Sequence, residues 1–60
     1  MNKYLEMRES TGLSREKYAA EIGMTSYSVW RWETGRSTPS PLARTQIEKL
    51  KKRLEKQGVL

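Results

Sequence analysis

Three polar side chains, Ser26, Tyr27 and Arg31, have hydrogen-bonding groups at spacings that a helix would gather on one side. They point away from Val29 and Trp32, whose spacing of three residues marks the buried face of the same helix. The Arg31 guanidinium can donate two hydrogen bonds to O6 and N7 of guanine, a contact worth roughly 1–3 kcal/mol of discrimination. Groups of this kind suit contacts to base edges, and these three residues are the candidates for such contacts if the chain binds a duplex.

Other roles for two of these side chains remain open. Arg31 as a solvated charge or a phosphate contact is one alternative, and the Tyr27 ring packed on a thymine methyl or a sugar is another. Ser28 and Trp30 flank this edge. For Trp30, a large ring on an outer face, three roles are compatible with the sequence: stacking on a sugar-phosphate, supporting a partner, or packing back on the preceding helix.

Further residues have groups suited to phosphate oxygens. Donors at helix starts and small residues in loops allow phosphates to approach closely. The guanidinium groups add charge, whereas Ser37 and Thr38 have the simpler alternative of forming a turn. The predicted phosphate contacts are Arg15, Thr25, Trp30, Arg36, Ser37 and Thr38.

The chain lacks most groups that perform covalent chemistry. It contains no histidine, cysteine or aspartate, and it has no glycine-rich phosphate loop. We therefore expect no enzymatic activity, no catalytic residue, no metal site and no cofactor.

The charge is unevenly distributed. The formal net charge is +5, and residues 31–60 supply all of it, with eight basic and three acidic side chains. A lopsided basic domain attracts nucleic acid first and anionic membranes second, although a solubilising surface is the simpler alternative. RNA binding is disfavoured because the chain offers no aromatic platform on a sheet. No segment is long and apolar enough to span a bilayer, so we expect a cytoplasmic protein without a membrane partner.

The elements that position these groups are four predicted helices in one domain, residues 1–60. Glycines mark the helix ends, and capping residues followed by helix-forming segments mark three of the starts. The clearest start is Ser40-Pro41, a cap followed by proline at the first helical position. The expected fold class is all-α, a compact bundle of four helices over residues 2–10, 15–22, 26–34 and 41–57.

The second and third predicted helices have the spacing of a helix-turn-helix unit. Ala19 allows the two helices to cross closely, Gly23 provides a positive φ in the turn, and Val29 anchors the second helix. These residues lie at offsets of four and six, which is a fairly specific signal.

Together these motifs resemble the lambda-repressor and Cro-like helix-turn-helix family, of the xenobiotic-response-element type, from about Tyr4 to Leu50. The resemblance implies a sequence-specific regulator of transcription, with a repressor favoured, that reads the major groove of double-stranded DNA with its third helix. It also implies that Arg8 of the first helix pairs with Glu33 as a structural ion pair. The residues that carry it are Met7-Arg8, Gly12-Leu13-Ser14, Ala19, Ile22-Gly23-Met24-Thr25, Val29, Arg31-Trp32-Glu33, Gly35-Arg36 and Pro39-Ser40.

Two departures from the family pattern bear on the partners. Arg15 stands where relatives usually have a glutamine that helps to hold a phosphate. The fifth helix that many relatives use to pair subunits is also missing, which leaves a homodimer on a palindromic site as one alternative.

The last predicted helix allows a different main role. Ile47, Leu50 and Leu54 form an apolar stripe, whose first part should close the core over the first helix. Its later part, with Val59 and Leu60, is either a subunit contact or a frayed end. The alternative function is an antitoxin or phage regulatory module whose main partner is another protein.

Overall fold

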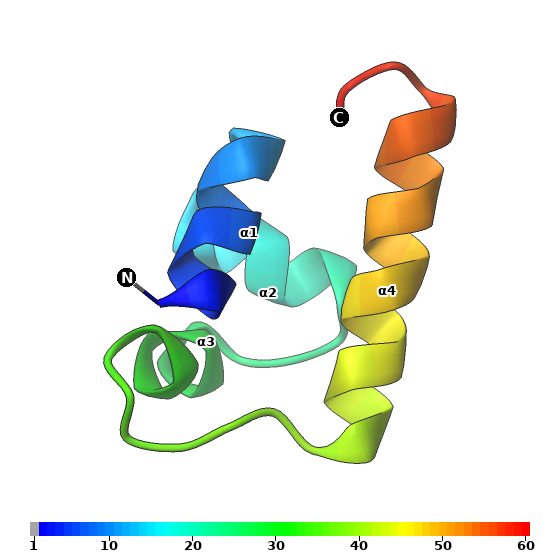
Figure 1. The fold of residues 1–60 in the computed structure, drawn as a ribbon. Helices are drawn as coiled ribbons and strands as arrows, with labels where there is room; N and C mark the ends of the chain where they lie inside the picture. The colour runs from blue at the N-terminus through cyan, green and yellow to red at the C-terminus, as the bar shows by residue number, and fades with distance from the viewer. Residues whose placement is uncertain (1) are drawn as a thin grey trace.

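Four helices make up most of residues 2–60, which a computed structural model describes (Figure 1). They are α1 (Lys3–Thr11), α2 (Arg15–Glu21), α3 (Ser26–Glu33) and α4 (Pro41–Lys56). Residues 2–60 contain no strand, so the fold is the predicted all-α bundle. None of the helices in this range has the length and hydropathy needed to cross a membrane.

Each helix begins at a side chain that accepts hydrogen bonds from the first turn. Ser40 Oγ accepts from the Ala43 N–H at 3.2 Å, and Pro41 follows at a position where no N–H is needed. The Asn2 side chain also donates to the Trp32 carbonyl at 2.8 Å, which ties the start of α1 to α3. The four N-caps are Asn2, Ser14, Thr25 and Ser40.

The helix ends differ by one residue from the ranges expected from the sequence. Four residues that the sequence placed inside helices are caps, whose backbone lies half outside the helix. In contrast, α1 continues one residue further than expected, because Gly12 and not Thr11 is its cap, with φ +73°. These four residues are the N-cap Asn2 and the C-caps Ile22, Thr34 and Gln57.

The turn between α2 and α3 depends on Gly23. Its φ is +70°, a backbone conformation that residues with a Cβ adopt only at a cost of roughly 1–2 kcal/mol. The Met24 N–H donates to the Ala19 carbonyl at 2.9 Å, which closes the turn. Ala19 is 2 % exposed at this crossing, so its small side chain allows the close approach of the two helices.

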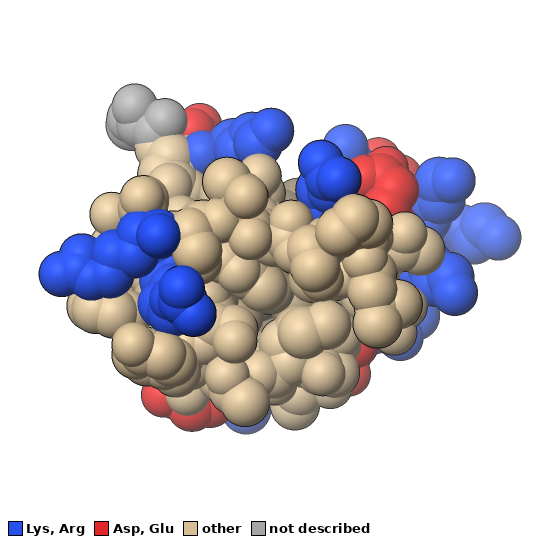
Figure 2. Space-filling model, turned by 90° about the horizontal axis from the view of Figure 1, so that it is seen from below, with Lys and Arg blue, Asp and Glu red and all other residues tan. Residues whose placement is uncertain are grey.

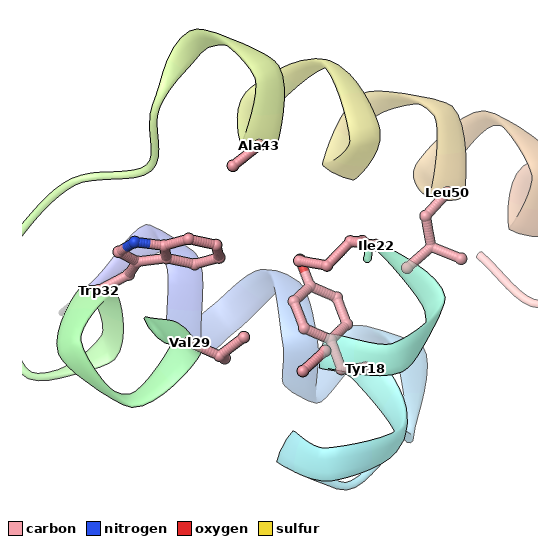
Figure 3. Close-up of a cluster of buried hydrophobic side chains, with 7 residues drawn as sticks. Tyr18, Ile22, Val29, Trp32, Ala43 and Leu50 are labelled. Carbon is pink, nitrogen blue, oxygen red and sulfur yellow. The ribbon is translucent and has the colours of Figure 1, made fainter. Parts of the chain in front are cut away.

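The core lies where α2, α3 and α4 meet (Figure 3). Ile22 is fully buried and lies near Tyr18 and Leu50 in the close-up, while Val29 and Trp32 point inward from α3. Burial raises the pKa of Tyr18 from its ordinary value of 10.0 to about 12, because the buried site disfavours the charged phenolate.

α4 covers a core against which Tyr4 and Met7 of α1 also pack, and closure of this core over the first helix stays a prediction. Its buried side chains, Ala43 and Leu50, face residues of α2 and α3 (Figure 3). Ile47 and Leu54 are partly buried against the same core. Leu42, an apolar residue in the first turn of this helix, is 67 % exposed. Ala43 takes the buried position because it lies four residues before Ile47 and seven before Leu50, in register with the stripe.

Candidate nucleic-acid interface

The outer edge of α3 consists of the residues that do not face the core. Val29 and Trp32 are 1 % and 6 % exposed, respectively, and they fix the orientation of the helix. On the other side, Tyr27 is 64 % exposed, Arg31 is exposed and Ser26 is half-buried. Tyr27 and Arg31 therefore lie on the side of α3 away from the buried pair, whereas Ser26 lies in the first turn at the border between the buried and the exposed side.

The first turn of α3 is held by Thr25. Its hydroxyl oxygen accepts a hydrogen bond from the Ser28 N–H at 3.1 Å and also contacts the Ser28 hydroxyl at 3.0 Å. Thr25 is thus the cap of the helix, it donates its own hydroxyl hydrogen to Ser28 Oγ, and it is exposed. A capped first turn presents Ser26 and Tyr27 in a fixed orientation.

Trp30 packs within the same surface. Its ring stacks on Tyr27, with centroids 5.7 Å apart, and the Arg36 guanidinium lies 4.7 Å from its centroid. The Arg31 guanidinium lies 5.9 Å from the centroid of Tyr27. These contacts form a chain from Arg31 through the two aromatic rings to Arg36, next to the predicted base-contacting edge.

The loop after α3 is folded back onto the end of the helix. Gly35 has φ +77°, and the N–H groups of Arg36 and Ser37 both donate to the Arg31 carbonyl, at 2.9 and 3.3 Å. Arg36 and Thr38 are exposed, and Ser37 is half-buried. This loop holds three predicted phosphate-contacting residues beside α3.

Glu33 joins three helices through its carboxylate. Its side chain is only 2 % exposed, and Arg8 Nε donates to its Oε2 at 2.6 Å while Arg8 Nη2 donates to Oε1 at 3.3 Å. Arg15 Nε donates to the same Oε1 at 3.2 Å. The hydrogen bond and the negative charge of Glu33 raise the pKa of Arg8. The two residues of the expected ion pair are in contact, and Arg15 adds a second cation.

The position of Arg15 differs from that of a freely extended phosphate ligand. Its side chain is 37 % exposed, and its Nε is directed to Glu33. Arg15 is also the first residue of α2, so the ion pair fixes the guanidinium between this helix and the end of α3.

Comparison with known protein families decides the classification. A family model described as a helix-turn-helix domain matches residues 6–50. This chain belongs to that helix-turn-helix family. The match is consistent with the lambda-repressor and Cro-like type indicated by the motifs, and families of this kind are typically non-enzymatic. Membership indicates a DNA-binding regulator. No curated protein and no solved structure matches the chain.

The charge on this helix-turn-helix domain is arranged in separate groups. Figure 2 views the molecule from below Figure 1, the side on which the loop between α3 and α4 runs. Basic side chains lie at both sides of this view with a broad uncharged surface between them, and acidic side chains lie near the margin. Cations that flank an uncharged surface suit a duplex, whose phosphates lie on either side of the base edges.

Several contacts of the domain had weak or no signals in the sequence. The stacking of Tyr27 on Trp30 could have been found, since residues three apart on a helix are neighbours. The contact between Arg15 and Glu33 joins residues 18 positions apart and depends on how α2 and α3 cross. No local pattern marks such a pair.

Proposed function

We propose that this helix-turn-helix domain is a sequence-specific regulator of transcription that binds double-stranded DNA with α3 in the major groove. The observation that supports this function best is the arrangement of α3. Its inner side is buried through Val29 and Trp32, and its outer side exposes Tyr27 and Arg31 beside a capped first turn. A helix fixed on one side and polar on the other is the geometry by which this motif reads base edges.

The roles on the base edges follow from the side-chain chemistry. Arg31 donates two hydrogen bonds to a guanine, and the exposed ring of Tyr27 packs on a thymine methyl or a neighbouring sugar. Ser26 lies in the first turn, which enters the groove deepest, and its hydroxyl can donate or accept.

The phosphates are contacted from both sides of α3. Arg36, Ser37 and Thr38 lie in the loop that folds back on the helix, and Thr25 lies at its start. Arg15 approaches the backbone from α2 while Glu33 holds its guanidinium. These contacts set the register of the domain on the duplex without reading sequence.

Repression is the simplest regulatory outcome of this geometry. A domain that occupies a promoter excludes other proteins from the same groove, and this effect needs only the DNA-binding surface. A symmetric pair of domains on a palindromic site would place its half-sites about one helical turn, roughly 34–36 Å, apart.

Selection of duplexes from a random pool tests the proposal through Arg31→Ala. The wild-type protein is expected to enrich a defined motif, whereas the variant should lose preference at one base position, with discrimination falling by roughly 1–3 kcal/mol there. A palindromic motif would also identify a dimer.

The matched control is Arg53→Ala, which removes the same charge from the C-terminal half of α4, away from α3 (Figure 1). This control should retain the full motif. Uniformly weaker binding of Arg31→Ala to all sequences would instead make Arg31 a phosphate contact, and the absence of any enriched motif with the wild type would contradict the function.

A protein-binding role is the second candidate, and exposed apolar residues favour it. Leu42 is 67 % exposed, and Val59 and Leu60 are 51 % and 40 % exposed at the end of the chain that follows α4. In an antitoxin or phage module these side chains would contact a protein partner, with DNA binding as a secondary activity. This role predicts that a partner protects α4 and its C-terminal extension, and not α3.

A further inference from the structure

Trp30 contacts two residues with different predicted tasks on DNA. Its ring stacks on Tyr27 at a centroid distance of 5.7 Å and an interplanar angle of 22°. The Arg36 guanidinium lies 4.7 Å from the centroid of Trp30. Tyr27 is a proposed base contact and Arg36 a proposed phosphate contact, so Trp30 physically links the two kinds of contact.

The backbone limits the positions that Arg36 can take. The positive φ of Gly35 reverses the chain, and the Arg36 N–H then donates to the Arg31 carbonyl at 2.9 Å. Ser37 donates to the same carbonyl at 3.3 Å. Because these bonds fix the Cα of Arg36 beside the last turn of α3, the remaining freedom lies in the side chain.

Trp30 restricts this remaining freedom. Long exposed side chains lose rotamer entropy when a ligand orders them, and that loss weakens binding. A cation held over an aromatic face and a ring stacked on a second ring have already lost part of this freedom in the unbound protein. Trp30 is half-buried, whereas Tyr27 and Arg36 are exposed, so the least mobile member of the group lies between the two others.

We propose that Trp30 is a positioning residue, which orders Tyr27 and Arg36 before DNA binds and in the orientation that they keep on the duplex. This inference rests on the proposed function, because both neighbours must contact DNA. It differs from a role in which Trp30 itself contacts a sugar-phosphate. In that role, the affinity lost with Trp30 would be independent of Arg36.

A double-mutant cycle on the selected duplex tests the proposal. Trp30→Leu removes the ring, and Arg36→Lys keeps the charge but removes the planar guanidinium that stacks. Each change is expected to weaken binding by about three- to tenfold. The variant with both changes should bind no more than about twofold more weakly than Trp30→Leu alone, because Trp30→Leu already removes the contact between Trp30 and Arg36 that Arg36→Lys would weaken.

Trp30→Phe is the conservative variant, which keeps an aromatic face. It should bind within about threefold of the wild type. Circular dichroism of each variant checks that the helices form. If Trp30→Leu does not fold, the comparison of Arg36→Lys with the wild type remains, and equal affinity of those two proteins would overturn the proposal.

A measurement on the unbound wild-type protein separates this inference from the proposed function. In NMR spectra, the ring current of Trp30 should shift the side-chain protons of Arg36 upfield from those of Arg44, an exposed arginine of α4. Trp30→Leu should remove the difference. Arg36 side-chain protons that are not shifted in the wild type would overturn the role of Trp30 but not the proposed function. The same holds if the affinity losses of the two single variants multiply in the double variant. Failure of the wild type to bind any duplex would contradict the proposed function, and with it this role, even when the Arg36 protons are shifted.

Discussion

Replacing Glu33 with alanine is expected to lower the free energy of unfolding by about 3–5 kcal/mol, the cost of breaking a buried ion pair. The Glu33 side chain is 2 % exposed and accepts from both Arg8 and Arg15. The Arg8 side chain is 16 % exposed, so its guanidinium would stay largely buried and keep only its bond to the Leu13 carbonyl at 3.2 Å. The cost comes from this uncompensated charge.

A change of this size is a large part of the stability of a short chain. Domains have roughly 0.05–0.15 kcal/mol of stability per residue. At this length, each 1 kcal/mol moves the melting temperature by roughly 4–8 °C. Thermal unfolding followed by circular dichroism should therefore show Glu33→Ala melting far below the wild type, or unfolded at all temperatures.

The exposed ion pair of Glu21 and Arg53 provides the matched control. The distance between Arg53 Nη2 and Glu21 Oε1 is 2.8 Å, but both side chains are about half exposed, at 50 % and 48 %. Exposed pairs contribute about 0–1 kcal/mol, so Glu21→Ala should melt close to the wild type. Equal melting temperatures for Glu33→Ala and Glu21→Ala would contradict a structural role for the buried pair.

Replacing Ile22 with alanine is expected to destabilise the domain by about 2–5 kcal/mol. Ile22 is 0 % exposed and lies where side chains of α2, α3 and α4 meet (Figure 3). Its removal leaves a cavity that rigid neighbours such as Tyr18 and Val29 cannot fill completely. Urea unfolding measures the loss as a lower transition midpoint with an unchanged slope.

Two further variants calibrate this result. Ile22→Val removes one methylene and should cost about 0.5–1.5 kcal/mol. Leu42→Ala removes more apolar volume, but from a side chain that is 67 % exposed, and it should change the stability by no more than about 0.5 kcal/mol. If Leu42→Ala destabilised the protein as strongly as Ile22→Ala, the position of α4 on the core would be wrong.

The sequence was sufficient to predict the fold class, because its strongest signals are local. Ser40-Pro41 marks the start of a helix by capping chemistry alone, and Gly12 and Gly23 mark stops through positive φ. Which residues of α4 contact the core was harder to predict from the sequence. The residue types of Leu42 and Ala43 do not indicate that the alanine is the buried one. Ala43 is buried because it lies in register with the apolar stripe of α4, and Leu42 does not.

The candidate site could be predicted from the sequence about as well as the fold. The spacing of Val29 and Trp32 identified the outer edge of α3, since one helix period relates both faces. Only one of the two cations that contact Glu33 was predicted. The resemblance implied Arg8, whereas Arg15 reaches the same carboxylate only through the crossing of α2 and α3. The contact of Arg36 with Trp30 likewise depends on a loop whose path the sequence does not specify.

Mapping of backbone amide shifts during titration with the selected duplex tests the DNA-binding role of α3 most directly. We expect the largest changes at Ser26, Tyr27 and Arg31 and in residues 36–38, with a smaller change at Arg15. Residues of the C-terminal half of α4 should change little. Changes confined to α4 and the residues after it, with α3 unaffected, would contradict the binding of DNA through α3.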